Sequence, residues 1–278
     1  MNKNISALLH ACKNLGVAYE LYHSGKNLVS IVLDKKRYIF SNWATPLNSQ
    51  SVMQLCQDKD YFYTYYKDVV KMPLTSSFFN PYSNEKYHRY LEQKTIYEII
   101  QKVEREHSYP LIVKKNRGSW GTNVFKVESR RELERGLLDI FNSNSASFDY
   151  IALVQEFIEI EQEYRAIFLY GELVFIYAKV VEGAEFKDNL SPLHWEGAKA
   201  QFVKDKEEFL RVENFMQPLF QKSIIPFCGV DIAKDSSGEY WLIEANSSPG
   251  FDYIIKHEGE DEVVKLYEKI ICSLQEIK

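Results

Sequence analysis

Two acidic residues and an asparagine near the carboxyl-terminal end of the chain have the spacing of a divalent-cation site. Asp231 lies in one apolar run, Glu244 and Asn246 lie in the next, and Ser237-Gly238 separates the runs. A two-residue turn at Ser237-Gly238 sets Asp231 opposite Glu244 on one face of a hairpin, with Asn246 further along that face. Two carboxylates and an amide oxygen suit Mg²⁺ and phosphate. The same pattern also fits a hairpin whose acidic side chains only face water.

A lysine followed by a glycine-containing loop is a second candidate site. Lys114 ends an apolar run, Gly118 and Gly121 lie in the loop that follows, and the chain becomes apolar again at Val124. Glycines let backbone N–H groups approach phosphate oxygens closely, and the lysine supplies a positive charge. The spacing is neither that of a P-loop nor that of a dinucleotide fingerprint. An ordinary glycine turn between two strands also explains it.

A third candidate is the apolar run 153–158, in which polar and apolar residues alternate where the run ends. Such a strand end can present backbone N–H and C=O groups to the edge of an adenine base, but a simple core strand fits as well. Arg165 lies in the next predicted strand. An arginine is costly to bury unpaired, so we expect Arg165 to face a carboxylate or a cleft.

Short helices and strands must position these residues. The apolar periodicity and the turn residues predict an α+β protein with a mainly antiparallel sheet around the candidate site. Ser129, followed by Glu132, predicts a helix start with a capping box. The predicted helices cover 4–15, 49–57, 59–66, 90–106, a segment after Ser129, 205–221 and 260–275, and the predicted strands cover 17–22, 28–33, 37–40, 111–113, 150–155, 163–169, 172–178, 226–233 and 239–245.

The composition is that of an ordinary globular protein, with 278 residues, 45% of them apolar and 26% charged. There are 34 basic and 39 acidic residues, and the net charge of −5 argues against a protein that coats nucleic acid. The four cysteines are far apart and form no CxxC pair, which fits free thiols in a reducing compartment. No apolar run is long enough for a membrane span or a secretory signal. We therefore expect a cytoplasmic protein that binds neither nucleic acid nor membranes.

The order of these features along the chain resembles that of the ATP-grasp superfamily. Asp58-Lys59, the lysine loop, the run 155–158, the Glu-x-Arg strand and the ending Glu244 to Gly250 follow one another as they do in that superfamily. The chain is most similar to the RimK-type glutamate ligases and to the ATP-grasp domains of cyanophycin and glutathione synthetases, over about residues 55–255. The resemblance implies an ATP-grasp fold, in which two α+β subdomains grip ATP between antiparallel sheets. The domains expected are a short N-terminal α/β segment at 1–56, a central subdomain with the phosphate loop at 57–142, and a C-terminal subdomain with the Mg²⁺ site at 143–278.

The resemblance also implies roles for individual residues. Lys114 and the loop from Gly118 to Val124 match the phosphate-binding part, the run 155–158 matches the adenine-binding hinge, and Glu163 matches a ribose-side acid. The implied ATP-binding residues are Lys59, Lys114, Gly118, Ser119, Trp120, Gly121, Gln155, Glu156, Phe157, Ile158, Glu163 and Lys179. The implied catalytic residues are Arg165, Lys187 and Asn189, and the implied ligands of two Mg²⁺ ions, or of Mn²⁺ in their place, are Asp231, Glu244 and Asn246.

The sequence departs from the family pattern at several places. Lys115 stands where the family often has proline, and Glu163 stands where it usually has aspartate. The family's His-x-Gly-Gly segment reappears, displaced, as His194 to Gly197 with Glu196 at a glycine position. The first 55 residues are short for the usual N-terminal domain. Because these parts border the substrates, the identity of the substrates is not carried over.

The resemblance implies an ADP-forming carboxylate–amine ligase that makes an amide or peptide bond through an acylphosphate. The expected partners are carboxylate and amine substrates of amino-acid or peptide type and, in a homo-oligomer, further copies of the chain. Two other functions remain open. One is an ATP-binding protein without ligase turnover, which the altered segment 190–200 favours, and the other is a phosphotransferase that releases a stable phosphorylated product.

Overall fold

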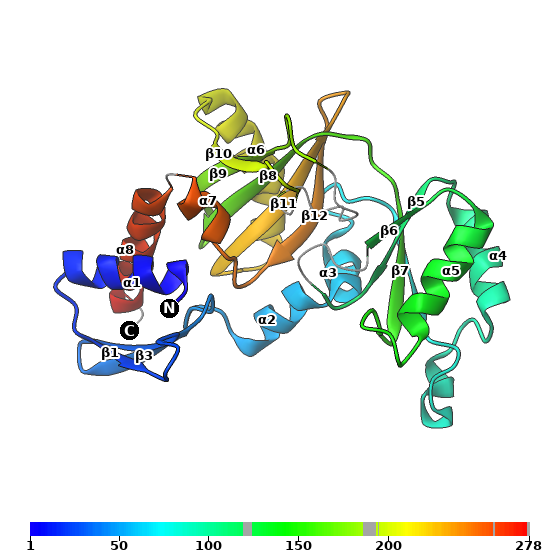
Figure 1. The fold of residues 1–278 in the computed structure, drawn as a ribbon, viewed down its shortest axis with the longest axis horizontal. Helices are drawn as coiled ribbons and strands as arrows, with labels where there is room; N and C mark the ends of the chain where they lie inside the picture. Colours follow the sequence, from blue (N-terminus) through cyan, green and yellow to red (C-terminus); the bar gives the residue numbers. More distant parts are fainter. Residues whose placement is uncertain (119–123, 186–192, 194, 258, 277–278) are drawn as a thin grey trace.

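The chain folds into three antiparallel sheets with helices packed against them (Figure 1). The computed structural model describes residues 1–118, 124–185, 193, 195–257 and 259–276. All strand pairings among these residues are antiparallel, as the sequence predicts. The strands are β1 (Tyr19–Tyr22), β2 (Leu28–Leu33), β3 (Lys36–Ser41), β4 (Thr75–Phe79), β5 (Leu111–Lys115), β6 (Val124–Val127), β7 (Ile151–Glu156), β8 (Ile160–Leu169), β9 (Glu172–Val180), β10 (Lys199–Phe202), β11 (Phe227–Asp235) and β12 (Tyr240–Asn246). The helices are α1 (Lys3–Asn14), α2 (Gln50–Gln57), α3 (Lys59–Tyr66), the 3-10 helix η1 (Glu85–Tyr90), α4 (Ile96–Glu106), α5 (Arg130–Phe141), α6 (Lys206–Lys222), α7 (Asp252–Lys256) and α8 (Glu260–Glu276).

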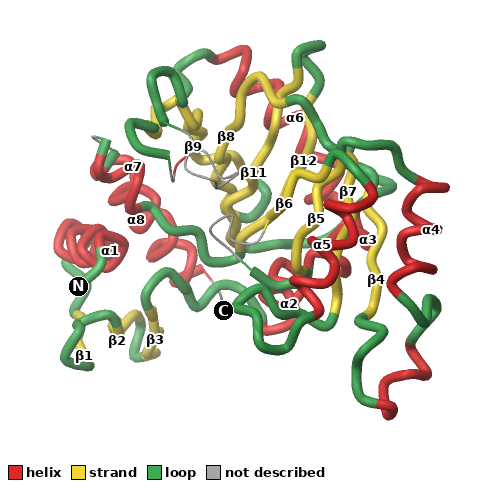
Figure 2. Tube along the Cα trace, turned by 45° about the vertical axis from the view of Figure 1, so that its right-hand side comes forward, coloured by secondary structure: helices red, strands yellow, loops and turns green. Residues whose placement is uncertain are grey.

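One sheet has the strand order β4-β7-β5-β6 and carries α4 and α5. Figure 2 shows α4 at the end of the molecule away from α1 and β1. Both helices are amphipathic and turn their apolar faces toward the sheet. The core between them is formed by Phe78, Ile99, Ile100, Val103, Leu111, Val113, Leu133, Leu137, Ile140 and Val154, among others.

The helix predicted over 90–106 begins later, at Ile96. The backbone at Thr95 is extended, and the Thr95 hydroxyl accepts a hydrogen bond from the N–H of Glu98 at 3.1 Å. Glu98 in turn accepts a hydrogen bond from the N–H of Lys94 at 2.7 Å. This is a capping arrangement that the Thr-x-x-Glu spacing could have revealed. The predicted cap at Ser129 is confirmed, because its hydroxyl accepts from the N–H of Glu132 at 3.4 Å.

A second sheet, of order β10-β9-β8-β11-β12, has two covered faces. One face of the sheet packs against α6, α2 and α3, and the side chains of these helices and of the sheet form one core. Phe62 and Tyr66 place α3 in this core, although the sequence groups α3 with the central subdomain. The core consists of Cys56, Phe62, Tyr66, Tyr164, Phe168, Ile176, Val212, Met216, Leu219, Ile225, Val230 and Leu242, among others.

The hairpin of β11 and β12 pairs Asp231 with Glu244, as predicted. The predicted two-residue turn is wrong, however. The N–H of Asp235 donates to the carbonyl of Glu239 at 3.0 Å, so that three residues form the loop and the register shifts by one. A β-bulge at Ile243 shifts the register back, because Asp231 pairs with Glu244 while the next residue pairs with Leu242. The two deviations cancel, and the candidate ligands face each other.

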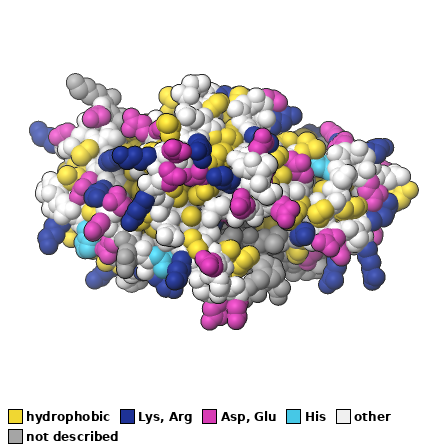
Figure 3. Space-filling model, turned by 90° about the horizontal axis from the view of Figure 1, so that it is seen from above, with side chains coloured by type: hydrophobic (Ala, Val, Ile, Leu, Met, Phe, Trp, Pro, Cys, Tyr) yellow, Lys and Arg dark blue, Asp and Glu magenta, His cyan; other side chains and the backbone are white. Residues whose placement is uncertain are grey.

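The face of the molecule in Figure 3 carries basic and acidic side chains interspersed with each other, without a large area of one sign. In the part of the chain that the structure describes, no helix combines the length and the apolar character that crossing a membrane requires. All four cysteines are free, as expected.

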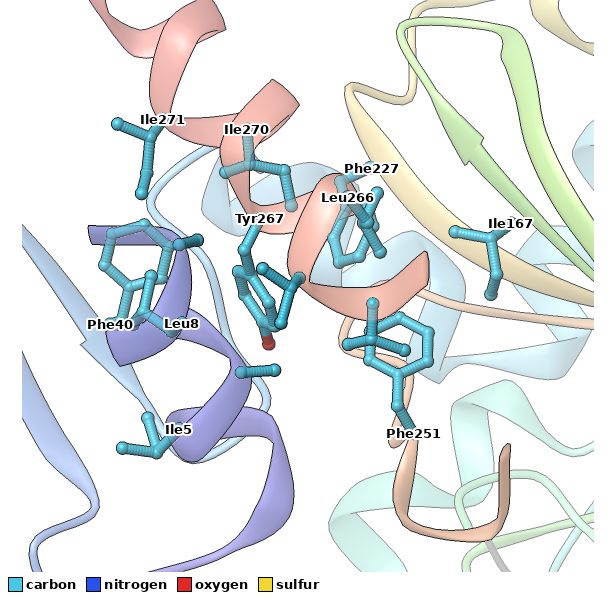
Figure 4. Close-up of a cluster of buried hydrophobic side chains, with 14 of the residues drawn as sticks. Ile5, Leu8, Phe40, Ile167, Phe227, Phe251, Leu266, Tyr267, Ile270 and Ile271 are labelled. Carbon is cyan, nitrogen blue, oxygen red and sulfur yellow. The ribbon is translucent and has the colours of Figure 1, made fainter. Parts of the chain in front are cut away.

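The first 48 residues share a core with the other face of the five-stranded sheet (Figure 4). α1 packs along α8, and apolar side chains of β2 and β3 share one core with α1. The amino-terminal segment therefore does not stand as a separate unit, because one continuous core joins it to the sheet. This core includes Ile5, Leu8, Ile31, Phe40, Ile167, Phe175, Phe227, Phe251, Leu266, Tyr267, Ile270 and Ile271.

Candidate active site

A cavity lies between the four-stranded and the five-stranded sheets, and it contains most of the residues that the sequence singles out. β5, β6 and β7 provide one wall, and β8, β9, β11 and β12 provide the other. Its lining residues are Lys59, Pro73, Ile112, Lys114, Lys115, Gly118, Val124, Gln155, Glu156, Phe157, Ile158, Ile160, Glu163, Lys179, Asp231, Ile243 and Glu244. Arg165 and Asn246 do not line it, but each contacts a lining carboxylate.

Part of the cavity lining is apolar and lies beside an extended backbone; this part is called the slot below. Side chains of Ile112, Phe157 and Ile158 are among those that line it. β7 ends at Glu156, and residues 157–159 continue outside the regular strand. The Glu156 N–H donates to the Leu74 carbonyl at 2.9 Å, and its carboxylate accepts from the Leu74 N–H at 2.7 Å, which fixes this strand end. A flat aromatic ring fits such a slot, with its edge facing the backbone.

Lys114 is buried where the slot meets the polar part of the cavity. It is 7% exposed, and its ammonium group donates to the Gln155 side chain at 3.0 Å. Gln155 is held in turn by Thr75, whose hydroxyl accepts from its amide at 2.8 Å. Burial, aided by the positive charge of Lys59, lowers the pKa of Lys114 to about 8. Among the described residues the ammonium group of Lys114 has one hydrogen-bond partner, and a buried ammonium group of this kind attracts an anion such as phosphate.

Lys59, the first residue of α3, joins the candidate phosphate loop to the acidic hairpin. Its ammonium group donates to the Gly118 carbonyl at 2.7 Å and lies 3.8 Å from the Glu244 carboxylate. The Asp60 N–H donates to the buried side chain of Asn116 at 2.9 Å. The base of the loop is therefore anchored to α3. Sequence reasoning missed Asn116 and Thr75, because their partners lie far away in the chain and no local motif marks them.

Four charged side chains form a buried cluster, and three of them, Glu163, Lys179 and Asp231, line the cavity. β-pairing sets Arg165 opposite Asp231 and Glu163 opposite Lys179. The guanidinium of Arg165 binds both Asp231 oxygens, one of them at 2.7 Å, which is the carboxylate partner expected for this arginine. Lys179 contacts Glu163 and also lies 3.1 Å from Asp231. The two positive and two negative charges balance one another, as buried charges require.

The cluster keeps Asp231 ionised. Burial alone would raise its pKa, but the adjacent charges of Arg165 and Lys179 hold the pKa of Asp231 well below the usual range. Burial raises the pKa of Glu163, and the charge of Lys179 counters part of that effect. Asp231 is therefore a permanent anion at neutral pH.

Asp231, Glu244 and Asn246 offer an oxygen-rich set of metal ligands. The amide nitrogen of Asn246 donates to Glu244 at 3.3 Å, which turns its carbonyl oxygen toward other partners. Among the described residues, no three His, Cys, Asp or Glu side chains converge as a ligand group. Two carboxylates and one amide oxygen, without nitrogen or sulfur, fit Mg²⁺ or Mn²⁺ and do not suit zinc.

Several predicted residues lie outside the described part of the chain. These are Ser119, Trp120 and Gly121 of the loop, the catalytic candidates Lys187 and Asn189, and His194. The altered segment is described in part. The N–H of Glu185 donates to the carbonyl of Glu196 at 2.9 Å, and Gly197 has a φ of +91°, a conformation that favours glycine.

Comparisons with known proteins find one matching family model and several related sequences. The family model described as "RimK-like ATP-grasp domain" matches residues 83–270 of this chain. The alpha-aminoadipate–LysW ligase LysX of Sulfurisphaera tokodaii is 28% identical over 222 residues, which are 78% of this chain and 69% of that one. A probable alpha-L-glutamate ligase of Vibrio atlanticus is 30% identical over 164 residues, which are 58% of this chain and 50% of that one, so the chain spans about half its length.

Solved structures show the same fold. The D-alanine–D-alanine ligase of Bacillus anthracis superposes with a TM-score of 0.57 at 15% identity, covering 84% of this chain and 71% of that one. A bifunctional glutathione synthetase of Pasteurella multocida gives a TM-score of 0.56 at 12% identity, covering 96% of this chain and 43% of that one.

Proposed function

Because the chain belongs to the family of RimK-like ATP-grasp domains, we propose that it is an ATP-dependent, ADP-forming carboxylate–amine ligase. The family membership confirms the resemblance in the sequence, and the ATP-grasp fold is the one expected. The observation that carries the proposal is that one cavity joins apolar side chains, the lysines Lys59 and Lys114, and the carboxylates of Asp231 and Glu244. Those are the parts needed for a base, a chain of phosphates and a divalent cation.

ATP fits the cavity from the slot to the acidic hairpin. ATP-grasp ligases bind ATP, and the Bacillus anthracis relative by fold has been solved with it. We assign the adenine to the slot beside Phe157 and Ile158, and the phosphates to Lys114 and Lys59. Glu163 lines the same cavity and is assigned to the ribose because the family resemblance implies it, and its carboxylate is engaged by Lys179.

Asp231, Glu244 and Asn246 would hold Mg²⁺, and Mn²⁺ would fit the same oxygens. When bound, the metal neutralises negative charge on the phosphate oxygens. The fit rests on the ionised state of Asp231, on the pairing of Asp231 with Glu244 and on the orientation of the Asn246 amide.

The reaction needs no nucleophilic side chain. A substrate carboxylate oxygen attacks the γ-phosphorus of ATP, the bond to the β-phosphate oxygen breaks, and ADP and an acylphosphate result. An amine then attacks the acyl carbon, phosphate leaves, and the amine loses a proton as the amide forms. Positioning and charge stabilisation are the contributions required of the protein.

Individual side chains supply that positioning. Lys114 holds the phosphates through a buried ammonium group. Arg165, fixed by two contacts to Asp231, is assigned to orient the carboxylate or to stabilise the charge on the tetrahedral intermediate. Lys187 and Asn189 remain expected beside the transferred phosphate.

The substrates are proposed to be of amino-acid or peptide type. One relative's name couples α-aminoadipate to LysW, and two others are named probable alpha-L-glutamate ligases. Another fold relative, the ATP-grasp ligase PsnB, has been solved with a minimal precursor. These names include amino acids as well as LysW and a precursor, so we propose that the first substrate screen contain both free amino acids and peptides.

The test is the release of ADP and phosphate from MgATP over pools of amino acids and short peptides. We expect phosphate only when a carboxylate pool and an amine pool are both present. Glu244→Ala should abolish it, whereas the matched control Glu239→Ala, an exposed acid of the same hairpin paired with Lys71, should retain it. ADP without phosphate would indicate a phosphotransferase. ATP binding without turnover in any pool would indicate an ATP-binding protein and contradict the proposal.

A further inference from the structure

Asn48 ties together the two strands that carry the candidate metal ligands. Its amide nitrogen donates to the carbonyl of Phe227 at 2.7 Å and to the carbonyl of Ser247 at 2.9 Å. Its amide oxygen accepts from the N–H of Phe227 at 3.1 Å. Phe227 begins the strand of Asp231, and Ser247 directly follows Asn246. The side chain of Asn48 therefore links β11 to the residue after β12, beyond the last pair of the two strands, which is Gly229 with Asn246.

Asn4 holds the same segment a few residues further on. It is fully buried, donates to the carbonyl of Pro249 at 3.3 Å and accepts from the N–H of Phe251 at 3.0 Å. Trp43 adds a contact from its indole nitrogen to Asp252 at 3.4 Å. The backbone from Ser247 to Phe251 is thus fixed from one side by the amino-terminal segment.

We propose that Asn48 and Asn4 are positioning residues for the metal site. This inference rests on the proposed function, because the ligands in question are the proposed Mg²⁺ ligands. Asn246 is the last residue of β12. The position of its side chain therefore depends on the backbone that directly follows it, because no further strand pairing among the described residues holds that backbone. Amides that fix that backbone restrict Asn246 and, through its hydrogen bond, Glu244. Groups that orient ligands in this way contribute strongly to metal affinity.

In this proposal the short amino-terminal segment, residues 1–48, supports the metal site. The segment is tied to the sheet by the continuous core that contains Ile5, Phe40 and Phe227 (Figure 4). Asn4 lies on α1 in that core, and Asn48 lies at the end of the segment, just before α2. The segment thereby acts as a rigid support from which two amides reach the same backbone.

The experiment measures Mn²⁺ binding by electron paramagnetic resonance in the presence of the ATP analogue AMP-PNP. Asn48→Ala and Asn4→Ala should each weaken Mn²⁺ binding by about tenfold. The matched controls are their neighbours Ser49→Ala and Asn2→Ala, which remove the caps of α2 and α1 but touch no residue of 247–251. The controls should lower thermal stability and leave Mn²⁺ affinity at the parent value.

Two further measurements separate positioning from loss of folding. Amide hydrogen exchange of peptides that cover 244–252 should quicken in Asn48→Ala and not in Ser49→Ala. Asn48→Asp keeps the acceptor for the N–H of Phe227 but loses the donors to the carbonyls of Phe227 and Ser247. We expect this variant to fold and to bind Mn²⁺ as weakly as Asn48→Ala does.

The outcomes distinguish the inference from the proposed function. Parent-like Mn²⁺ affinity in both asparagine variants would overturn the inference while leaving the metal site intact. Equal weakening in variants and controls would also overturn it, because general destabilisation would then explain the effect. A parent protein that binds no Mn²⁺ with AMP-PNP would overturn the proposed metal site, and the inference with it.

Discussion

Replacing Gly229 with alanine should disturb the candidate metal site through packing alone. Gly229 pairs with Asn246 across the hairpin. A Cβ at this position would lie 2.8 Å from Cβ of Pro249, 3.1 Å from Ile167 and 3.2 Å from Arg165. The proline ring is rigid, and the backbone beside it is held by Asn4. Pro249 would have to move by about 0.6 Å to restore ordinary contact.

The displacement of Pro249 sets the expected loss of folding stability and of turnover. Overpacking of this kind costs about 1–3 kcal/mol, which urea unfolding would detect. Displacements approaching 1 Å near reacting groups lower turnover by up to about a hundredfold. We therefore expect Gly229→Ala to fold, with lower stability and with ADP release reduced by at least about tenfold.

Gly136→Ala is the matched control for the urea and turnover assays. Gly136 lies in α5, where a new Cβ would meet Val113 at 3.4 Å, an ordinary contact. Alanine is also the better helix former, by about 1 kcal/mol. The control should unfold at the same or a higher urea concentration and retain its activity. Parent-like stability and turnover in Gly229→Ala would refute the packing argument.

Three other changes have definite expected results. Burial is the main cause that lowers the pKa of Lys114 to about 8, and bound phosphate favours the charged form of the lysine. ATP affinity should therefore be constant below pH 8 and fall above it. Binding above pH 8 should take up protons, which calorimetry in two buffers of different ionisation enthalpy would measure. Lys114→Met should bind ATP weakly without that pH dependence, and a flat profile in the parent would contradict the reasoning. Asp231→Asn should cost about 3–5 kcal/mol in urea unfolding, because Arg165 and Lys179 lose their shared partner, whereas an unchanged midpoint would show that the cluster does not stabilise the fold. Ser129→Ala should cost about 1 kcal/mol by removing the cap of α5 and leave turnover unchanged, and a loss of activity would show that α5 affects the site.

The order of elements could be predicted from the sequence because apolar periodicity and turn residues are local signals. The sequence and the structure differ where a local pattern is ambiguous. Apolar spacing alone predicts a helix from Tyr90, whereas the capping pattern of Thr95 and Glu98 starts it at Ile96. Ser237-Gly238 predicts a loop of two residues, whereas three residues form it. Asp231 still pairs with Glu244 because a bulge at Ile243 compensates, and no local pattern reveals that bulge.

The site could be predicted in part for a similar reason. Lys114, Glu244 and their neighbours lie in motifs that the family resemblance makes visible. Asn48 and Asn4 lie in no motif, and their partners are 179 to 247 residues away in the chain. Contacts of that range arise only when the core of the amino-terminal segment has formed. Composition and spacing cannot reveal them.

The most direct test of the proposed ligase is capture of its activated carboxylate with hydroxylamine. The protein is incubated with MgATP, a pool of amino-acid and peptide carboxylates and hydroxylamine, and both hydroxamate and ADP are measured. We expect equal amounts of hydroxamate and ADP, both dependent on the carboxylate pool and both absent in Glu244→Ala. ADP formed without hydroxamate, or a phosphorylated product that resists hydroxylamine, would contradict the proposed function.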